Sequence, residues 1–344
     1  MKTALALLDR GWIPESLVRR GIRKLLRERL DEQTAVHSLN PEGKLERFLD
    51  EMRAAQVALV PDKANEQHYE VPPGFFQIAL GPHLKYSSAY FEGPETSLAD
   101  AERRMLELTC ARAELEDGQD ILELGCGWGS LTLWMAEHYP NSRITAVSNS
   151  SLQRRFLEQR FAERGVNQVT VLTRDMNEFK PEGSFDRIVS VEMFEHMRNW
   201  EALLNRLAPH LRADGKLFLH IFVHRKFAYT FEVRDETDWM SRYFFSGGMM
   251  PSYDLTDRLE APLSVEETWE VSGVHYARTA EAWHRNLVSR RSAAMLALAE
   301  TYPAAELERW YQRWRVFFLS CAELFGYDGG TEWFVAHKRF IKRP

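Results

Sequence analysis

Cysteine is scarce in this chain, and long apolar runs and a strong excess of one charge are missing. The three cysteines, Cys110, Cys126 and Cys321, are widely spaced. They form neither a zinc pattern nor an obvious disulfide framework, which fits a reducing compartment. No segment is long and apolar enough to span a membrane, and the apolar run at 4–8 is too short for a secretory core. We therefore expect a cytoplasmic protein without stable membrane insertion.

Charge and composition narrow the class of protein further. The 344 residues include 44 Lys and Arg against 50 Asp and Glu, which gives a net charge of -6. The chain lacks the excess of basic residues that is typical of proteins that bind nucleic acid, so we expect no nucleic-acid partner. A hydrophobic fraction of 44% and a charged fraction of 27% are typical of a globular protein with a large core.

A glycine loop is the most informative motif. The apolar run at 121–124 ends in Gly125, Gly127 and Gly129, and a helical pattern follows. A strand, a glycine loop and a helix in this order form a cradle for nucleotide-like ligands, although a plain strand-to-helix turn also has this pattern. No Gly-Lys-Ser/Thr follows, which disfavours an ATP site, and Ser148 stands where an NAD site has an acidic residue. With Glu123 before the loop, a cationic nucleoside, S-adenosyl-L-methionine (SAM), is favoured.

Alternating strand and helix patterns predict a Rossmann-like α/β fold with a mostly parallel, twisted sheet. Residues 1–70 predict an N-terminal helical extension, and 71–344 the main domain. Within that domain, the aromatic-rich stretch 225–315 reads as a mostly helical substrate cap, inserted before the closing strand. The expected strands lie at 120–124, 143–147, 168–172, 186–191, 216–222 and 333–340.

Polar residues follow the second and third expected strands, where ligands of open α/β sheets bind. Ser148, Asn149 and, one helical turn later, Gln153 suit the hydroxyls of a ribose. Asp175 suits the amino group of adenine, with Met176 packed on the ring. A helix N-cap is an equally good interpretation of Asp175.

Two carboxylates and an imidazole, Glu192, Glu195 and His196, follow the fourth strand within five residues. Such a cluster suits proton handling, and bracing of the next helix is the alternative. The spacing lacks a further metal ligand set, so we expect no metal. His220, on the fifth strand, is either a contact near the substrate or a buried structural histidine.

Several motifs together resemble the cyclopropane-fatty-acid synthase superfamily of SAM-dependent enzymes. These are the segment 86–91, the Gly125 loop, Asn149 with Gln153, and the segment 191–197. The segments 227–229, 247–252, 321–327 and 332–333 are closer to the coclaurine N-methyltransferase group. The resemblance covers roughly residues 70–340 and implies a class I methyltransferase fold. The expected SAM contacts are Tyr86, Ser87, Gly125, Gly127, Ser148, Asn149, Gln153, Asp175, Met176 and Val191.

The resemblance also separates two branches of chemistry. Cyclopropane synthases hold a bicarbonate base through a cysteine, a glutamate, a histidine and a tyrosine. Here Ser88 replaces the cysteine and Phe317 lies where the tyrosine is expected, while Glu195 and His220 remain. Glu192 stands where those synthases commonly have glycine and amine methyltransferases have glutamate.

The implied activity is transfer of the SAM methyl group to a small cyclic or aromatic amine, leaving S-adenosyl-L-homocysteine. At pH 7 roughly one alkylamine molecule in a thousand is neutral, so selecting the neutral form from solution costs about 4 kcal/mol. A nearby base that accepts the proton of the bound ammonium removes much of this cost. The alternative is a lipid-modifying C-methyltransferase or cyclopropane-fatty-acyl-phospholipid synthase, and a homodimer is left open. The resemblance assigns acid–base roles to Glu192, Glu195 and His196, and the wall of the substrate pocket to Trp314 and Phe317. We expect His220 to contact the substrate as well.

Overall fold

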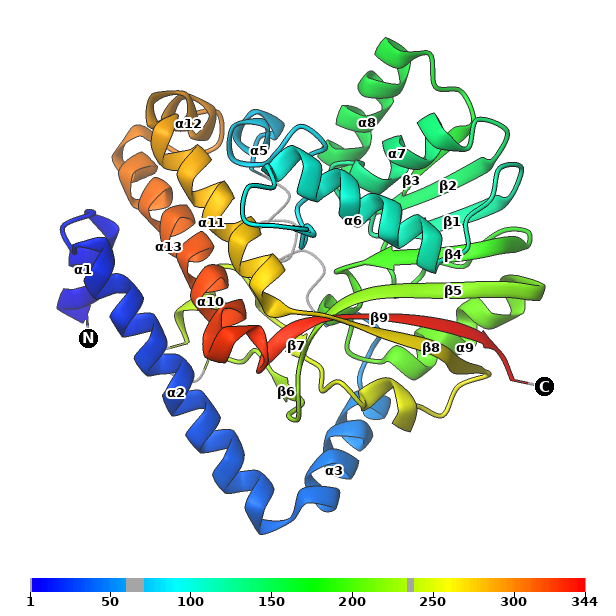
Figure 1. Ribbon diagram of the computed structural model, residues 1–344, viewed down its shortest axis with the longest axis horizontal. Helices are drawn as coiled ribbons and strands as arrows, with labels where there is room; N and C mark the ends of the chain where they lie inside the picture. Colours follow the sequence, from blue (N-terminus) through cyan, green and yellow to red (C-terminus); the bar gives the residue numbers. More distant parts are fainter. Residues whose placement is uncertain (1, 60–70, 234–237, 344) are drawn as a thin grey trace.

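The computed structural model describes residues 2–59, 71–233 and 238–343. Seven strands of this part form one sheet in the order β3-β2-β1-β4-β5-β9-β8 (Figure 1). The first five strands in chain order run parallel, and β9 is antiparallel to both of its neighbours. The predicted α/β fold is confirmed. The strands are β1 (Asp120–Leu124), β2 (Arg143–Ser148), β3 (Val169–Thr173), β4 (Phe185–Val191), β5 (Leu211–His224), β8 (Leu263–Val271) and β9 (Trp333–Lys342).

Some helices cover the sheet, and others form a group beside it. Figure 1 places α6 over the parallel strands, α11, α12 and α13 beside the sheet, and α1 to α3 along the outer edge. A short pair, β6 (Tyr229–Thr230) and β7 (Met249–Met250), forms a second sheet. The helices are α1 (Lys2–Asp9), α2 (Glu15–Leu39), α3 (Pro41–Ala54), α5 (Pro73–Ala79), α6 (Leu98–Arg112), α7 (Ser130–His138), α8 (Ser151–Arg164), α9 (Trp200–Leu207), α10 (Trp239–Tyr243), α11 (Gly273–Ser289), α12 (Arg291–Leu298) and α13 (Leu307–Phe325).

The predicted N-terminal helices are present and packed. In α3 the apolar stripe Phe48, Leu49 and Met52 is buried in the core below the sheet, so its helical spacing reflects packing. Arg19 of α2 reaches two carboxylates of the helical side, Glu281 of α11 at 2.5 Å and Glu323 of α13 at 3.0 Å. The expected boundary at residue 70 lies outside the described residues, and the division at that point stays a prediction.

The edge strand β8 is the one element of the sheet that the sequence patterns miss. It lies inside 225–315, the stretch expected to be a mostly helical cap, and the helical interpretation is wrong there. Its middle is only partly buried, as befits an edge strand, and a register shift between Val265 and Glu267 interrupts the alternation. In the stretch expected to form the cap, α10 precedes β8, and α11, α12 and the first part of α13 follow it.

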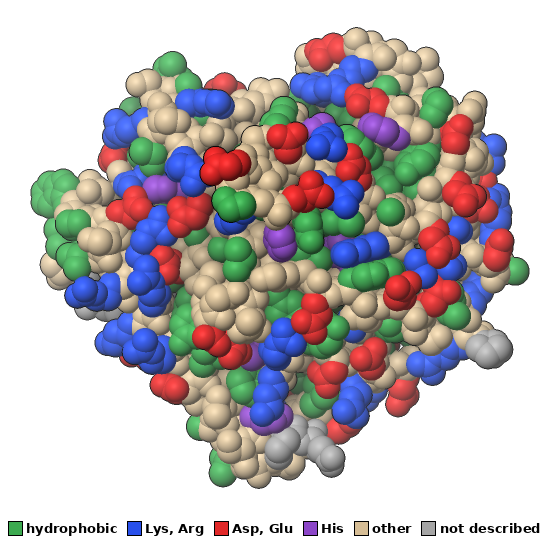
Figure 2. Space-filling model, in the orientation of Figure 1, with side chains coloured by type: hydrophobic (Ala, Val, Ile, Leu, Met, Phe, Trp, Pro, Cys, Tyr) green, Lys and Arg blue, Asp and Glu red, His purple; other side chains and the backbone are tan. Residues whose placement is uncertain are grey.

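The surface agrees with the composition. Figure 2 shows Lys, Arg, Asp and Glu side chains interspersed over the visible face, without a broad field of one sign. Among the described residues, none of the helices combines the length and apolar character needed to cross a membrane.

Candidate functional site

Two cavities adjoin at the carboxyl ends of the parallel strands. They share Gly125, Gly127, Gln153, Glu192 and His196 in their walls. All ten expected cofactor contacts line them. Tyr86, Ser87 and Val191 line the first cavity, Ser148, Asn149, Asp175 and Met176 line the second, and Gly125, Gly127 and Gln153 line both.

The glycine loop forms the floor of the site. The absence of side chains at its glycines leaves space there that a Cβ atom would reduce. Gly125 has a φ of +78°, and a Cβ there would lie 2.6 Å from Cγ of Met193. Such a distance is far inside van der Waals contact, and left-handed backbone favours glycine. The loop thus leaves a cradle in which a ligand can approach the backbone.

The second cavity suits an adenosine. Ser148 Oγ donates a 2.7 Å hydrogen bond to Oε1 of Gln153, and Nε2 of the buried Gln153 has no partner among the described residues. A buried amide donor of this kind needs an acceptor, and a ribose hydroxyl would supply one. Asp175 caps a turn by accepting from the Asn177 amide at 2.8 Å, and no helix begins at this position. The N-cap alternative is therefore wrong, and Asp175 stands in the cavity wall.

The first cavity carries one cation and one acid that match an amino-acid tail. Lys85, buried and in contact with the Ser87 hydroxyl, has its pKa lowered to about 8 by burial. Glu123 accepts a 2.5 Å hydrogen bond from Thr132 Oγ1, and burial raises its pKa to about 7. These residues and the cradle fit the methionine part of SAM, whose carboxylate and ammonium would neutralise the two side chains. The sequence motifs did not single out Lys85, although it directly precedes Tyr86.

Glu192 lies at the junction of the two cavities, in a left-handed backbone conformation with a φ of +47°. Its Oε1 accepts from the Ser88 amide at 2.9 Å and from His220 Nε2 at 3.1 Å. Its Oε2 accepts from the Tyr276 hydroxyl at 2.6 Å. Burial raises the pKa of Glu192 above its ordinary value, and Lys85, the Tyr276 hydroxyl, the Ser88 amide and His196 offset only part of this rise. Three donors directed at one carboxyl group favour its ionised form.

His196 and an aromatic wall complete the first cavity. The His196 ring stacks on Phe245 with centroids 4.8 Å apart, and burial lowers its pKa to about 4. The imidazole is therefore neutral at physiological pH. Other aromatic residues in this wall are Tyr86, Trp128, Phe222, Tyr276, Trp283 and Phe317.

The structure separates three predicted site residues from the cavities. Glu195 is fully buried, lines neither cavity and accepts a 2.6 Å hydrogen bond from the Phe222 amide. Burial, and after it the charge of Glu192, raise its pKa well above the ordinary value, which favours the neutral acid. Trp314 is a core residue packed on Phe75 at 4.9 Å. His220 meets the site only through Glu192. Of the three expected substrate contacts, Phe317 alone lines a cavity.

The fold and the paired cavities at its strand ends define a SAM-dependent methyltransferase. A family model, mycolic acid cyclopropane synthetase, matches residues 60–330. The chain belongs to this family. An (S)-coclaurine N-methyltransferase of Thalictrum flavum subsp. glaucum is 37% identical, with 98% of this chain and 95% of that protein covered. The cyclopropane-fatty-acyl-phospholipid synthase of Escherichia coli strain K12 is 27% identical, with 93% of this chain and 78% of the synthase covered.

Solved structures also resemble this chain in both branches, the N-methyltransferases and the cyclopropane synthases. Coclaurine N-methyltransferase, in a crystal structure bound to N-methylheliamine and S-adenosylhomocysteine, has a TM-score of 0.93 and 34% identity over 99% of each chain. A cyclopropane synthase from Mycobacterium tuberculosis has a TM-score of 0.69 and 24% identity, with 81% of this chain and 97% of the synthase covered. The second likeness concerns the fold alone. The predicted resemblance to the coclaurine N-methyltransferase group is confirmed.

Proposed function

We propose that this methyltransferase transfers the methyl group of SAM to the nitrogen of a small cyclic or aromatic amine. The observation that carries the proposal is the position of the Glu192 carboxylate, which lies between the cavity with the residues suited to adenosine and the cavity with the aromatic wall. The similarity to coclaurine N-methyltransferases over nearly the whole chain supports it.

The side chains of the first cavity supply what an amine needs. An ionised Glu192 attracts the incoming ammonium and accepts its proton, which frees the nitrogen lone pair. The neutral imidazole of His196 offers a polar contact beside it without repelling the cation. The aromatic wall stabilises the positive charge of substrate and product by cation–π attraction. Bound SAM supplies an electrophilic methyl group, and the cavity walls orient the nitrogen toward it.

The contacts of Glu192 disfavour the cyclopropane alternative. By the family resemblance, position 88 and His220 belong to the set that holds a bicarbonate base. In this chain the Ser88 amide and His220 both donate to the carboxylate of Glu192. The Ser88 hydroxyl donates to the Ala89 carbonyl at 3.1 Å. A side-chain carboxylate thus takes the hydrogen bonds that an external base would need.

A two-arm assay tests the function. The purified protein is incubated with SAM and either a panel of cyclic secondary amines or vesicles of unsaturated phospholipid. We expect N-methyl products and S-adenosyl-L-homocysteine in the amine arm alone. Turnover of phospholipid without turnover of any amine would move the chain to the lipid branch.

A cytoplasmic location and a homodimer are also part of the proposal. Light scattering of the purified protein tests for the dimer.

A further inference from the structure

Two residues behind the cavity wall, Arg112 and His337, connect to Glu192 through the sheet. Arg112 is the last residue of α6, and His337 lies in the middle of β9. The strand register makes these residues neighbours. Val191, which precedes Glu192, pairs with His220 across β4 and β5, and His220 pairs with His337 across β5 and β9. Neither Arg112 nor His337 lines the two cavities.

An unbroken chain of three hydrogen bonds links Arg112 to Glu192. Arg112 Nη1 lies 2.8 Å from His337 Nδ1, and His337 Nε2 lies 2.9 Å from His220 Nδ1. His220 Nε2 then lies 3.1 Å from Glu192 Oε1. Both imidazoles are fully buried, and burial lowers the pKa of each well below its ordinary value. Each ring is therefore neutral and has one donor and one acceptor.

The chemistry of the guanidinium fixes the direction of the chain. A guanidinium has donors only, so Nδ1 of His337 must accept. His337 then carries its proton on Nε2 and donates to Nδ1 of His220. His220 in turn carries its proton on Nε2 and donates to Glu192. The chain is complete only when the carboxyl group of Glu192 is an acceptor.

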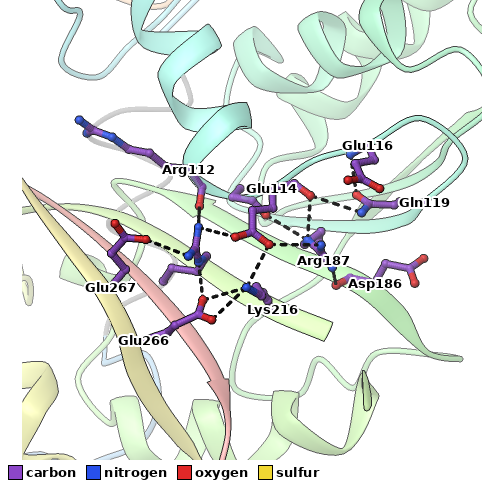
Figure 3. A network of polar contacts seen from close by, with 11 residues as sticks. Arg112, Glu114, Glu116, Gln119, Asp186, Arg187, Lys216, Glu266 and Glu267 are labelled. Atoms are coloured by element: carbon purple, nitrogen blue, oxygen red, sulfur yellow. Dashed lines mark hydrogen bonds and ion pairs between the residues drawn. The ribbon is translucent and has the colours of Figure 1, made fainter. Parts of the chain in front are cut away.

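A network of ion pairs anchors the start of the chain. The Arg112 carbonyl accepts a 3.0 Å hydrogen bond from Arg339 Nη1, and Arg339 is paired with Glu114 at 2.8 Å and Glu267 at 2.9 Å. Figure 3 shows the Arg112 side chain extending away from this network. Its guanidinium lies over the ring of Trp269, 5.2 Å from the centroid. The network thus holds the backbone of Arg112 in place, while the Arg112 guanidinium donates to His337.

We propose that Arg112 and His337 are positioning residues that fix the tautomer of His220 and so hold Glu192 as the proton acceptor of the amine. This inference rests on the proposed function for its catalytic meaning. Because the guanidinium keeps its proton at any physiological pH, the chain does not conduct protons away from Glu192. Its effect is to orient the donor. Lys85, Tyr276 and His196 also face Glu192 and stay unchanged in the test.

Nitrogen NMR of the histidine rings tests the chain without any substrate. With uniformly 15N-labelled protein and assignment by His220→Gln and His337→Phe, we expect both rings in the Nε2–H form. Arg112→Met removes the donor, so His337 and His220 should show mixed tautomers, and Arg112→Lys should restore them. Arg103→Met is the matched control, since Arg103 lies on the same helix, is exposed and pairs with Glu107 at 2.6 Å.

The pH dependence of kcat/KM with an amine gives the second readout. Loss of an oriented donor raises the pKa of Glu192, so the acid limb in Arg112→Met should move up by about 0.5–1 pH unit, which is roughly three- to tenfold in rate at the low-pH side. An Nδ1–H form of His220 in the unaltered protein, or unchanged tautomers in Arg112→Met, would overturn the proposal. If no amine is methylated, the proposed function fails, and the NMR result alone decides whether Arg112 and His337 position His220.

Discussion

The hydroxyl of Tyr276 donates a 2.6 Å hydrogen bond to Oε2 of Glu192, although 84 residues separate them in the sequence. Tyr276 belongs to α11, in the helical part beside the sheet, and Glu192 follows β4 of the sheet. The site therefore exists only when the helical part is docked on the sheet. The same tyrosine stacks on Phe325, with centroids 4.1 Å apart, which holds its ring in place.

Tyr276→Phe should shift the pH profile without loosening the packing. The ring and its stacking on Phe325 are retained, but the carboxylate of Glu192 loses a donor. A donor to the ionised form lowers a carboxyl pKa, so its loss raises the pKa of Glu192. We expect the acid limb of kcat/KM to move upward by about 1 pH unit, with an unchanged plateau at high pH. A drop in rate that is uniform across the pH range would contradict this role.

Glu192→Gln and Glu195→Gln should behave differently, although the two residues are neighbours in the motif. Glu192 is the acceptor in the cavity, so its replacement should lower kcat/KM by about 100-fold or more, with SAM affinity retained in calorimetry. Burial raises the pKa of Glu195 well above its ordinary value, which favours the neutral form that glutamine mimics. Its glutamine variant should keep the bond from the Phe222 amide and change kcat/KM by less than about threefold. Equal losses in both variants would place Glu195 in the chemistry.

Gly125→Ala should weaken SAM binding, and Gly118→Ala is its matched control. Both glycines have positive φ, +78° and +89°, so both variants carry a similar backbone cost of about 1–2 kcal/mol. Only at position 125 does a Cβ meet another side chain, that of Met193, whereas the space around Gly118 is open. We expect calorimetry to show at least about tenfold weaker SAM binding for Gly125→Ala and unchanged affinity for Gly118→Ala.

Glu123→Gln should stabilise the SAM-free protein at high pH. The folded-state pKa is raised to about 7 from an ordinary value of 4.5. The stabilising contribution of this acid is complete below pH 4.5 and is lost as the pH rises through 7. The variant should therefore match the unaltered protein near pH 4.5 and exceed it by about 1–3 kcal/mol in unfolding free energy at pH 8. Thermal melts across this range, with exposed Glu116→Gln as control, measure the difference.

Much of the fold could be predicted from sequence because its signals are local. The parallel strands are buried apolar runs, and the glycine loop marks the turn between β1 and α7. The strand β8 escaped because its exposed positions are polar and its register shifts at Val265. An edge strand of this kind has neither the apolar run of a buried strand nor the regular alternation of a half-buried one.

The site was predicted only where a strand end or a motif marks it. The cofactor candidates follow the strands and therefore converge, as the topology requires. Arg112 and His337 are 225 residues apart and meet only through the pairing of β5 with β9 and the position of α6. Glu195 lies in a motif and the resemblance assigned Trp314 to the substrate pocket, but both side chains are buried in the core. No local pattern distinguishes a motif residue that faces a cavity from one that faces the interior.

The left-handed backbone at Glu192 has an evolutionary consequence. Its φ of +47° is a conformation in which glycine is relaxed and glutamate is strained, and the family resemblance places glycine at this position in cyclopropane synthases. The turn is thus shaped for glycine, and glutamate occupies it at a small cost in stability. Since the glycine codons GGA and GGG differ from the glutamate codons GAA and GAG by one base, a single point mutation can exchange these two residues at position 192, and with them the carboxylate that we propose as the base.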